Sequence, residues 1–197
     1  MSYANFKDVV QTGDLLLTRS TGNFLSDIQE YFIHAPVTHV SIIIKSKNKL
    51  FIYEGTTLRG TAVRELDDYL EKSKCKNIFW RQLYSEKSKL KKELIKYSAS
   101  HYDWTFLKYV LFHMTNLSFI YNILVAYDVL KNSIGKALGL YIREAYNCSS
   151  LVVQILKNLD AIDPTYVTEA IYPSHFLPYH AKILNSKLLG NVIKINY

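Results

Sequence analysis

The sequence predicts an α+β fold in which an antiparallel sheet packs against a helix that begins at Cys148. Two patterns carry this prediction: short runs of β-forming residues bounded by polar or glycine residues, and one apolar stripe at helical spacing late in the chain. The 197 residues, 49% of them hydrophobic, suffice for one sizeable core. We therefore expect a single domain over residues 1–197.

Six short runs are typical of strands because they are rich in apolar β-formers and end at polar or glycine residues. A polar connection at 45–48 separates the second run from the third and has the length that hairpins use, so these two runs are expected to pair antiparallel. The six predicted strands are 14–17, 37–44, 50–54, 60–66, 77–83 and 188–195.

Helical spacing is clearest from Cys148 onward, with Asn147 as a plausible N-cap. Residues 86–100 indicate a second helix. In the helix after Cys148, the stripe that faces the core consists of Leu151, Val152, Ile155, Leu156 and Leu159, and the opposite side carries Gln154, Lys157 and Asn158.

An apolar and mostly helical insertion is predicted at about 104–142. Its central stretch, 109–127, has no formally charged residue and approaches the roughly 20 residues that cross a bilayer. Polar groups such as His113 and Asn116 are costly in hydrocarbon. We therefore favour a buried insertion over an element that contacts a membrane surface or an acyl chain, and place a true membrane span last.

The net charge of +7 comes mostly from lysine, with 19 Lys and five Arg. Arginine is the usual reader of phosphates and bases, so the lysine runs favour solvated faces over a specific nucleic-acid site. No glycine-rich nucleotide motif is present, and the scattered histidines have no metal-ligand spacing. We expect no cofactor and no metal.

Cysteine content favours a reducing compartment. Cys75 and Cys148 are the only cysteines, too few for a disulfide framework, and they form no C-x-x-C motif. The first residues lack the basic start and apolar run of a signal peptide. The expected location is therefore the cytoplasm.

Cys148 has the position that a nucleophilic cysteine needs. At the first turn of a helix, backbone N–H groups and the positive end of the helix dipole favour the thiolate, and the same N–H groups can bind an oxyanion. Cys75, in the lysine-rich run 71–76, lacks this setting. The alternative for Cys148 is a small buried hydrophobe, the commonest fate of a free cysteine.

His39 lies inside an apolar strand, where a lone histidine is more often a core residue with satisfied hydrogen bonds than a catalytic base. Glu54 favours the catalytic interpretation. If 45–48 is the whole connection, Ile44 faces Lys49 and His39 lies directly opposite Glu54 on the same face. Glu54 would then orient the imidazole of His39 and leave its second nitrogen for a thiol.

Five motifs, taken in order, resemble the circularly permuted NlpC/P60 group of papain-like enzymes, which has bacterial YiiX-like members and a poxviral branch. In that group the strand histidine and the following glutamate precede the helix-borne cysteine, which implies the catalytic set Cys148, His39 and Glu54. The motifs are Gly13-Asp-Leu-Leu-Leu17, Thr38-His-Val-Ser-Ile-Ile43, Tyr53-Glu-Gly55, Tyr102-Asp-Trp-Thr-Phe106 and Tyr146-Asn-Cys-Ser-Ser-Leu-Val152.

Two departures from this group affect the substrate. The group usually has Tyr directly before the cysteine, whereas here Asn147 lies between Tyr146 and Cys148. The insertion between Phe106 and Tyr141 is also longer than in the bacterial pattern. The Asn-Cys pair is also similar to the lecithin:retinol acyltransferase-like branch, whose members act on lipid acyl groups. The expected partner is therefore a peptide, an N-acyl compound or a lipid-acyl compound.

Three functions follow as hypotheses. The first is a thiol hydrolase of amidase or peptidase type that uses a Cys-His-Glu triad and an acyl-enzyme. The second is a lipid acyltransferase, thioesterase or phospholipase with the same triad. The third is a catalytically silent binding protein that keeps the fold. Enrichment in Lys, Ile, Asn and Tyr indicates an AT-rich genome, and with the poxviral branch of the group this suggests a large DNA virus as the source. A viral origin would place the protein in the host cytoplasm or the virion.

Overall fold

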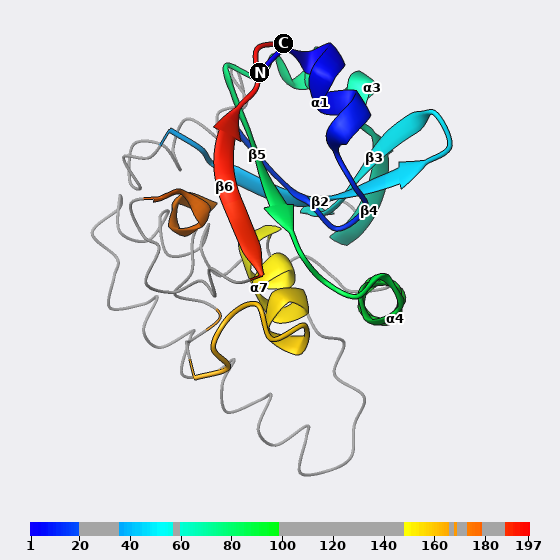
Figure 1. Cartoon of the computed structure of the whole chain (residues 1–197), viewed down its shortest axis with the longest axis vertical. Coiled ribbons are helices and arrows are strands. Elements are labelled where there is room, and N and C mark those ends of the chain that lie inside the picture. The colour runs from blue at the N-terminus through cyan, green and yellow to red at the C-terminus, as the bar shows by residue number, and fades with distance from the viewer. Residues whose placement is uncertain (20–35, 57–59, 99–147, 166–167, 169–172, 179–187) are drawn as a thin grey trace, which may run out of the picture.

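The computed structural model describes residues 1–19, 36–56, 60–98, 148–165, 168, 173–178 and 188–197, and these form an α+β structure (Figure 1). The predicted insertion at 104–142 and the predicted cap Asn147 lie outside the described residues. In chain order the elements are α1 (Tyr3–Val9), β1 (Leu15–Arg19), β2 (His39–Ser46), β3 (Lys49–Thr56), β4 (Gly60–Glu65), α3 (Leu66–Ser73), β5 (Asn77–Leu83), α4 (Lys87–Lys96), α7 (Cys148–Asn158), the short 3₁₀ helix η2 (Pro173–Phe176) and β6 (Leu189–Lys194).

One antiparallel sheet has the strand order β4-β3-β2-β1-β5-β6. Each of the six predicted strand runs corresponds to one of these strands, because short apolar runs of β-forming residues that end at polar or glycine residues make a strand visible in sequence. The sheet places β2 and β3, which carry His39 and Glu54, beside each other and next to the edge strand β4. The two ends of the described chain also meet, through a bridge between Ser2 and Asn196 (Figure 1).

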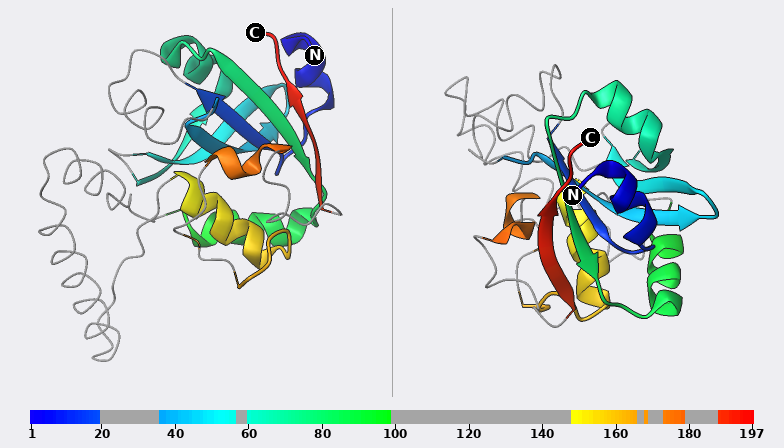
Figure 2. Two further views of the ribbon diagram at one scale, coloured as in Figure 1. Left: turned by 90° about the vertical axis from the view of Figure 1, so that its left-hand side faces the viewer. Right: turned by 45° about the horizontal axis from the view of Figure 1, so that its top comes forward.

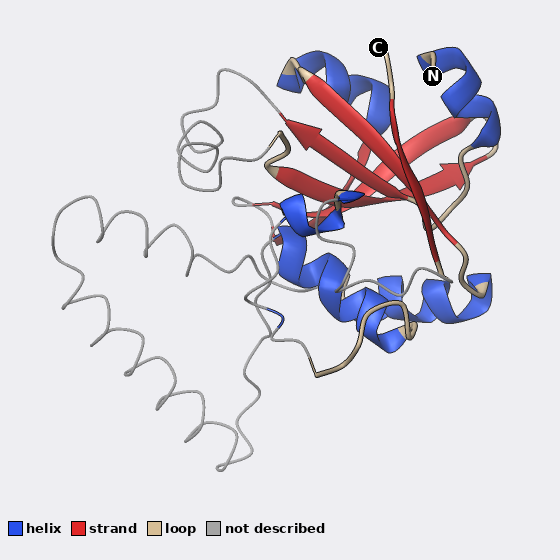
Figure 3. Cartoon of the chain, turned by 60° about the vertical axis from the view of Figure 1, so that its left-hand side comes forward, coloured by secondary structure: helices blue, strands red, loops and turns tan. Residues whose placement is uncertain are grey.

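Helices cover both faces of the sheet (Figures 2 and 3). α7 and α4 pack on the face that carries Leu15, Leu17, Val40 and Ile42. The other face is covered by α1 and α3 and has its own apolar cluster. That second cluster includes Phe6, Leu16, Ile43, Ile52, Leu66, Leu70 and Trp80.

The helix prediction was correct for α4 and α7, whereas α1 and α3 were not predicted. Within the described residues α7 spans Cys148–Asn158, with the predicted apolar stripe buried and Asn158 exposed. α1 has only seven residues and buries a single side chain, Phe6, while α3 has only eight. Helices this short carry too few buried positions to show a clear period of 3.6.

The predicted register of the β2–β3 hairpin was wrong by two residues. Its turn contains two residues, Lys47 and Asn48, and Ser46 pairs with Lys49. Lys47 adopts a φ of 51°, and positive φ at the first central residue is what tight two-residue hairpin turns require. Ile42 therefore pairs with Tyr53. The polar residues at 45 and 46, expected in the turn, instead extend the strand.

In the observed register, His39 and Glu54 still lie on the same face of the sheet. Continuing the observed register places His39 across from Thr56 and Glu54 across from Ser41. A shift of two residues preserves side-chain direction in a strand, whereas a shift of one reverses it. His39 and Glu54 are thus diagonal neighbours on adjacent strands, a separation that long side chains span.

Within the described part of the chain, no helix is long and apolar enough to cross a membrane.

Candidate active site

Cys148, His39 and Glu54 come together where the start of a strand meets the start of a helix. His39 is the first residue of β2, Cys148 is the first residue of α7, and Glu54 lies near the end of β3. Nε2 of His39 contacts Oε2 of Glu54, and the imidazole also hydrogen-bonds the thiol of Cys148. Since Glu54 engages Nε2, Nδ1 is the nitrogen available to the sulfur.

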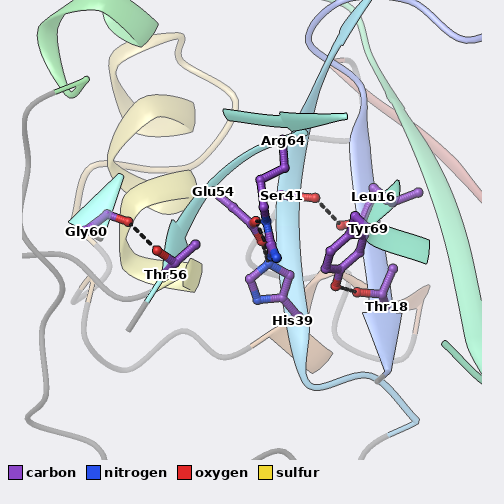
Figure 4. Close-up of polar contacts among 9 residues, drawn as sticks. All are labelled: Leu16, Thr18, His39, Ser41, Glu54, Thr56, Gly60, Arg64 and Tyr69. Carbon is purple, nitrogen blue, oxygen red and sulfur yellow. Dashed lines mark hydrogen bonds and ion pairs between the residues drawn. The ribbon is translucent and has the colours of Figure 1, made fainter. Parts of the chain in front are cut away.

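Glu54 is fully buried and uses both carboxylate oxygens (Figure 4). Oε2 contacts His39, whereas Oε1 accepts from Nε of Arg64 at 2.5 Å and contacts Nη2 of the same guanidinium. Burial by itself would raise the pKa of this carboxyl group, but the positive charges and hydrogen bonds of His39 and Arg64 reverse the effect and lower its pKa. Glu54 is therefore held as a carboxylate.

Cys148 is 6% exposed and lies against His39 and the backbone of β2. Burial opposes ionisation of its thiol, yet the charge and hydrogen bond of His39 and a hydrogen bond from the Val40 N–H lower its pKa below the ordinary value. The geometry thus favours a thiolate facing an imidazolium.

His39 shows the complementary shift. Burial would lower the pKa of the imidazole, but the neighbouring Cys148 and Glu54 outweigh burial and raise the pKa to about 10. The imidazole side chain is 20% exposed, so the pair is not sealed from solvent. An imidazolium that persists through neutral pH can deliver a proton to a leaving group.

The second thiol, Cys75, has a different environment. It is partly buried and hydrogen-bonds Tyr69 and Thr18. Burial is the main cause that raises its pKa above the ordinary value. At neutral pH Cys75 is therefore a protonated thiol, whereas Cys148 lies in a site that stabilises the thiolate.

Sequence reasoning missed the residues that support Glu54. Arg64 lies on β4 opposite Ile52, which puts it diagonal to Glu54 and on the same face. Its guanidinium lies 4.8 Å from the ring centroid of Tyr69, and the Tyr69 hydroxyl hydrogen-bonds Thr18 at 2.7 Å (Figure 4). The available signal was an arginine at an alternating strand position in a chain with only five arginines.

His175 lies in η2, whereas His34, His101, His113 and His180 are outside the described residues. Among the residues that the structure describes, no group of three or more His, Cys, Asp or Glu side chains is arranged to hold a metal ion.

Comparisons with known proteins give similarity to solved structures. No family model matches the sequence, and no curated protein matches it. Among solved structures, the chain is similar to the crystal structure of metalloprotein YiiX from Escherichia coli O157:H7, described as DUF1105, with 15% sequence identity and a TM-score of 0.49. The similarity covers 76% of this chain and 66% of YiiX, so the chain spans just under two thirds of the length of that protein.

Proposed function

We propose that this protein is a thiol hydrolase of amidase or peptidase type, with Cys148 as nucleophile, His39 as base and Glu54 as the carboxylate that orients the base. The observation that carries the proposal is the position of His39, which contacts a buried carboxylate through Nε2 and the Cys148 thiol through its imidazole. Nucleophile, base and orienting group are recognised by these roles, whatever their order in the chain.

The first half of the reaction forms an acyl-enzyme. The Cys148 thiolate attacks the substrate carbonyl carbon, a C–S bond forms, and the carbonyl oxygen becomes an oxyanion that backbone N–H groups at the start of α7 can bind. Collapse of this intermediate breaks the C–N bond. The leaving nitrogen takes the proton of the His39 imidazolium, and Cys148 remains as a thioester.

The second half of the reaction restores the enzyme. His39, now neutral, removes a proton from water as the water oxygen attacks the thioester carbon. Collapse breaks the C–S bond, releases the acid and returns the thiolate and imidazolium pair. Glu54 stays ionised throughout, because its contacts with His39 and Arg64 stabilise the carboxylate.

The order of the elements supports the finer assignment to a permuted papain-like fold. The strands with the base and the carboxylate precede the helix with the nucleophile, as in the NlpC/P60 group that the motifs resemble. Both cysteines are free thiols, which fits action in a reducing compartment such as the cytoplasm.

Thiol-reactive probes test this proposal. Folded wild type, Cys148→Ala and His39→Ala proteins are treated with a peptide-like chloroacetamide and with a long-chain β-lactone, and labelling is followed by intact mass and peptide mapping. We expect one label on Cys148 in wild type, none in Cys148→Ala, and at least about tenfold slower labelling in His39→Ala at neutral pH. Cys75 in the same molecule is the internal control for an unactivated thiol.

The outcomes separate the three hypotheses. Preferential labelling by the peptide-like probe supports the amidase, whereas preferential labelling by the β-lactone would move the assignment to a lipid acyl substrate with the same triad. Cys148 that reacts no faster than Cys75 in folded protein would indicate a binding protein. Labelling of Cys148 that is unchanged in His39→Ala would remove His39 from its role as base.

A further inference from the structure

We infer that Arg64 is a positioning residue that completes the site, because it balances the charge of Glu54 and allows the thiolate and imidazolium pair to form beside a buried carboxylate. This assignment rests on the proposed function. It goes beyond the triad, since Arg64 contacts Glu54 and acts on Cys148 only through that carboxylate.

A fully buried carboxylate needs partners for both oxygens, and His39 contacts only Oε2. Arg64 reaches Oε1 with Nε at 2.5 Å and also with Nη2, so two donors of one guanidinium converge on the oxygen that His39 does not contact. The orientation of Glu54, and therefore of the imidazole that it holds, depends on this second partner.

A Cys148 thiolate, a His39 imidazolium and a Glu54 carboxylate together carry one net negative charge in a buried site. The negative charge of Glu54 opposes ionisation of Cys148. An arginine side chain stays positively charged in proteins, so Arg64 makes the set of four neutral and weakens that opposition.

Arg64 is held in place although its side chain is 41% exposed. Its guanidinium lies over the ring of Tyr69, which comes from α3 and hydrogen-bonds Thr18 on β1. Thr18 pairs directly with His39 in the sheet. Arg64 is thus packed against Tyr69, which is itself anchored to Thr18, the residue that pairs with His39. These contacts hold the guanidinium near Glu54.

Other titratable groups near the site come from α3 and the segment after it. Tyr69 lies beside His39 with ring centroids 6.2 Å apart, and burial raises the pKa of its hydroxyl well above the ordinary value. Cys75 hydrogen-bonds Tyr69 and also has a raised pKa, again mainly from burial. Both groups are neutral at neutral pH, so Glu54 is the negative charge that Arg64 must balance.

The experiment measures the rate at which iodoacetamide alkylates Cys148 as a function of pH, by peptide-resolved mass spectrometry on folded full-length protein. We expect Arg64→Met to slow alkylation about tenfold at about pH 6 and much less at about pH 8.5, because loss of the positive charge disfavours the thiolate on the acid side. Arg64→Lys, which keeps the charge and loses the two-point contact, is expected to recover part of the rate.

Lys49→Met is the matched control. Lys49 forms an exposed ion pair with Glu65 on the same two strands, so this change removes one positive charge and one ion pair away from the site. We expect its alkylation profile to match wild type. An equal effect of Lys49→Met and Arg64→Met would show that only the overall charge matters and would overturn the assignment.

A double variant keeps the test decisive even where Arg64→Met folds poorly. In Glu54→Gln/Arg64→Met both members of the pair become neutral, and the profile should match that of Glu54→Gln alone, because Arg64 acts through Glu54. A further loss in the double variant contradicts this. If the Cys148 alkylation profile of folded Arg64→Met is the same as that of wild type, only the role of Arg64 is overturned. If Cys148 in wild type has the same alkylation profile as Cys75, the proposed triad and the role of Arg64 are overturned together.

Discussion

Glu54 is the most constrained side chain of the site at the scale of single residues. It is a buried carboxylate whose two oxygens meet different partners, the imidazole of His39 and the guanidinium of Arg64. Both partners donate hydrogen bonds, so the side chain between them must accept on both sides. A carboxylate does this, whereas an amide of the same shape accepts through only one of its two terminal atoms.

Glu54→Gln should therefore weaken both folding and the reactivity of Cys148. The amide nitrogen of Gln would face either His39 or Arg64, so two hydrogen-bond donors would meet without an acceptor. We expect a loss of about 1–3 kcal/mol in the free energy of unfolding, measured by urea denaturation. Loss of the negative charge should also let His39 deprotonate at lower pH than the wild-type pKa of about 10. In a profile of substrate hydrolysis against pH, the fall in rate on the alkaline side, where the His39 imidazolium loses its proton, would then occur at lower pH.

The control for this change is Glu65→Gln, which alters an exposed carboxylate on the neighbouring strand. It should leave both the unfolding free energy and the pH–rate profile close to wild type. Equal behaviour of the two variants would mean that Glu54 does not orient His39.

At the scale of elements, burial patterns decided which features could be predicted from sequence. The strands were predicted because each is a short run of mostly buried β-forming residues, and α7 because its buried positions have helical spacing. The hairpin register was not, because turn length depends on the φ of one residue, Lys47, which composition does not reveal. The direct opposition of His39 and Glu54 was therefore wrong, but both were correctly placed on one face, since an error of two residues preserves side-chain direction.

Arg64 could not be assigned to the site from sequence for a related reason. Its approach to Glu54 depends on the register between β3 and β4, where Glu54 pairs with Ala62. The connection between the strands, residues 57–59, has the sequence Thr-Leu-Arg. It contains no Gly, Asn or Asp that would indicate a turn type and so fix that register. Tyr69 was missed because it belongs to α3, a helix too short to be predicted.

The turn before β1 gives a prediction at the same scale. Gly13 has a φ of 105°, and a Cβ atom there would lie 2.7 Å from Cδ2 of Leu90 on α4. Gly13→Ala should destabilise the fold by about 2 kcal/mol or more, through backbone strain and a clash in a packed core. The midpoint of urea denaturation measures the loss.

Gly190→Ala is the comparison for that change. Gly190 has no positive φ, and its nearest neighbour to an added Cβ is Cβ of Gln82 at 3.2 Å. We expect a smaller loss, since only the crowding remains. A Gly13→Ala protein as stable as Gly190→Ala would show that the turn accommodates a side chain.

At the scale of the whole molecule, the proposed triad joins the two layers that the sheet separates. Cys148 belongs to α7, which packs on one face, whereas Glu54 shares the other face with Ile52, near Tyr69 of α3. His39, at the start of β2, contacts both partners. Formation of the thiolate and imidazolium pair therefore depends on the docking of both layers, and its chemistry is linked to global stability.

This linkage predicts how stability changes in acid. The pKa of Glu54 is lowered in the folded protein from an ordinary value of 4.5, so its contribution is present above about pH 4.5 and is lost as pH falls through the lowered pKa. Burial raises the pKa of Asp14 from 3.8, so the folded protein binds the Asp14 proton more tightly than the unfolded chain does. The contribution of Asp14 to stability therefore increases as pH falls, opposite to that of Glu54. The lowered pKa of Asp67 adds to the loss in acid.

We therefore expect the unfolding free energy of wild type to fall as pH drops below about 4.5, and the fall to be smaller in Glu54→Gln, as measured by urea denaturation over the acid range. Asp14 and Asp67 are present in both proteins, so their contributions cancel in the difference. The variant should be less stable than wild type at neutral pH and approach it in acid, where wild type has lost the same ion pairs. Parallel acid curves would show that Glu54 is not an ionised group stabilised by His39 and Arg64 in the folded protein.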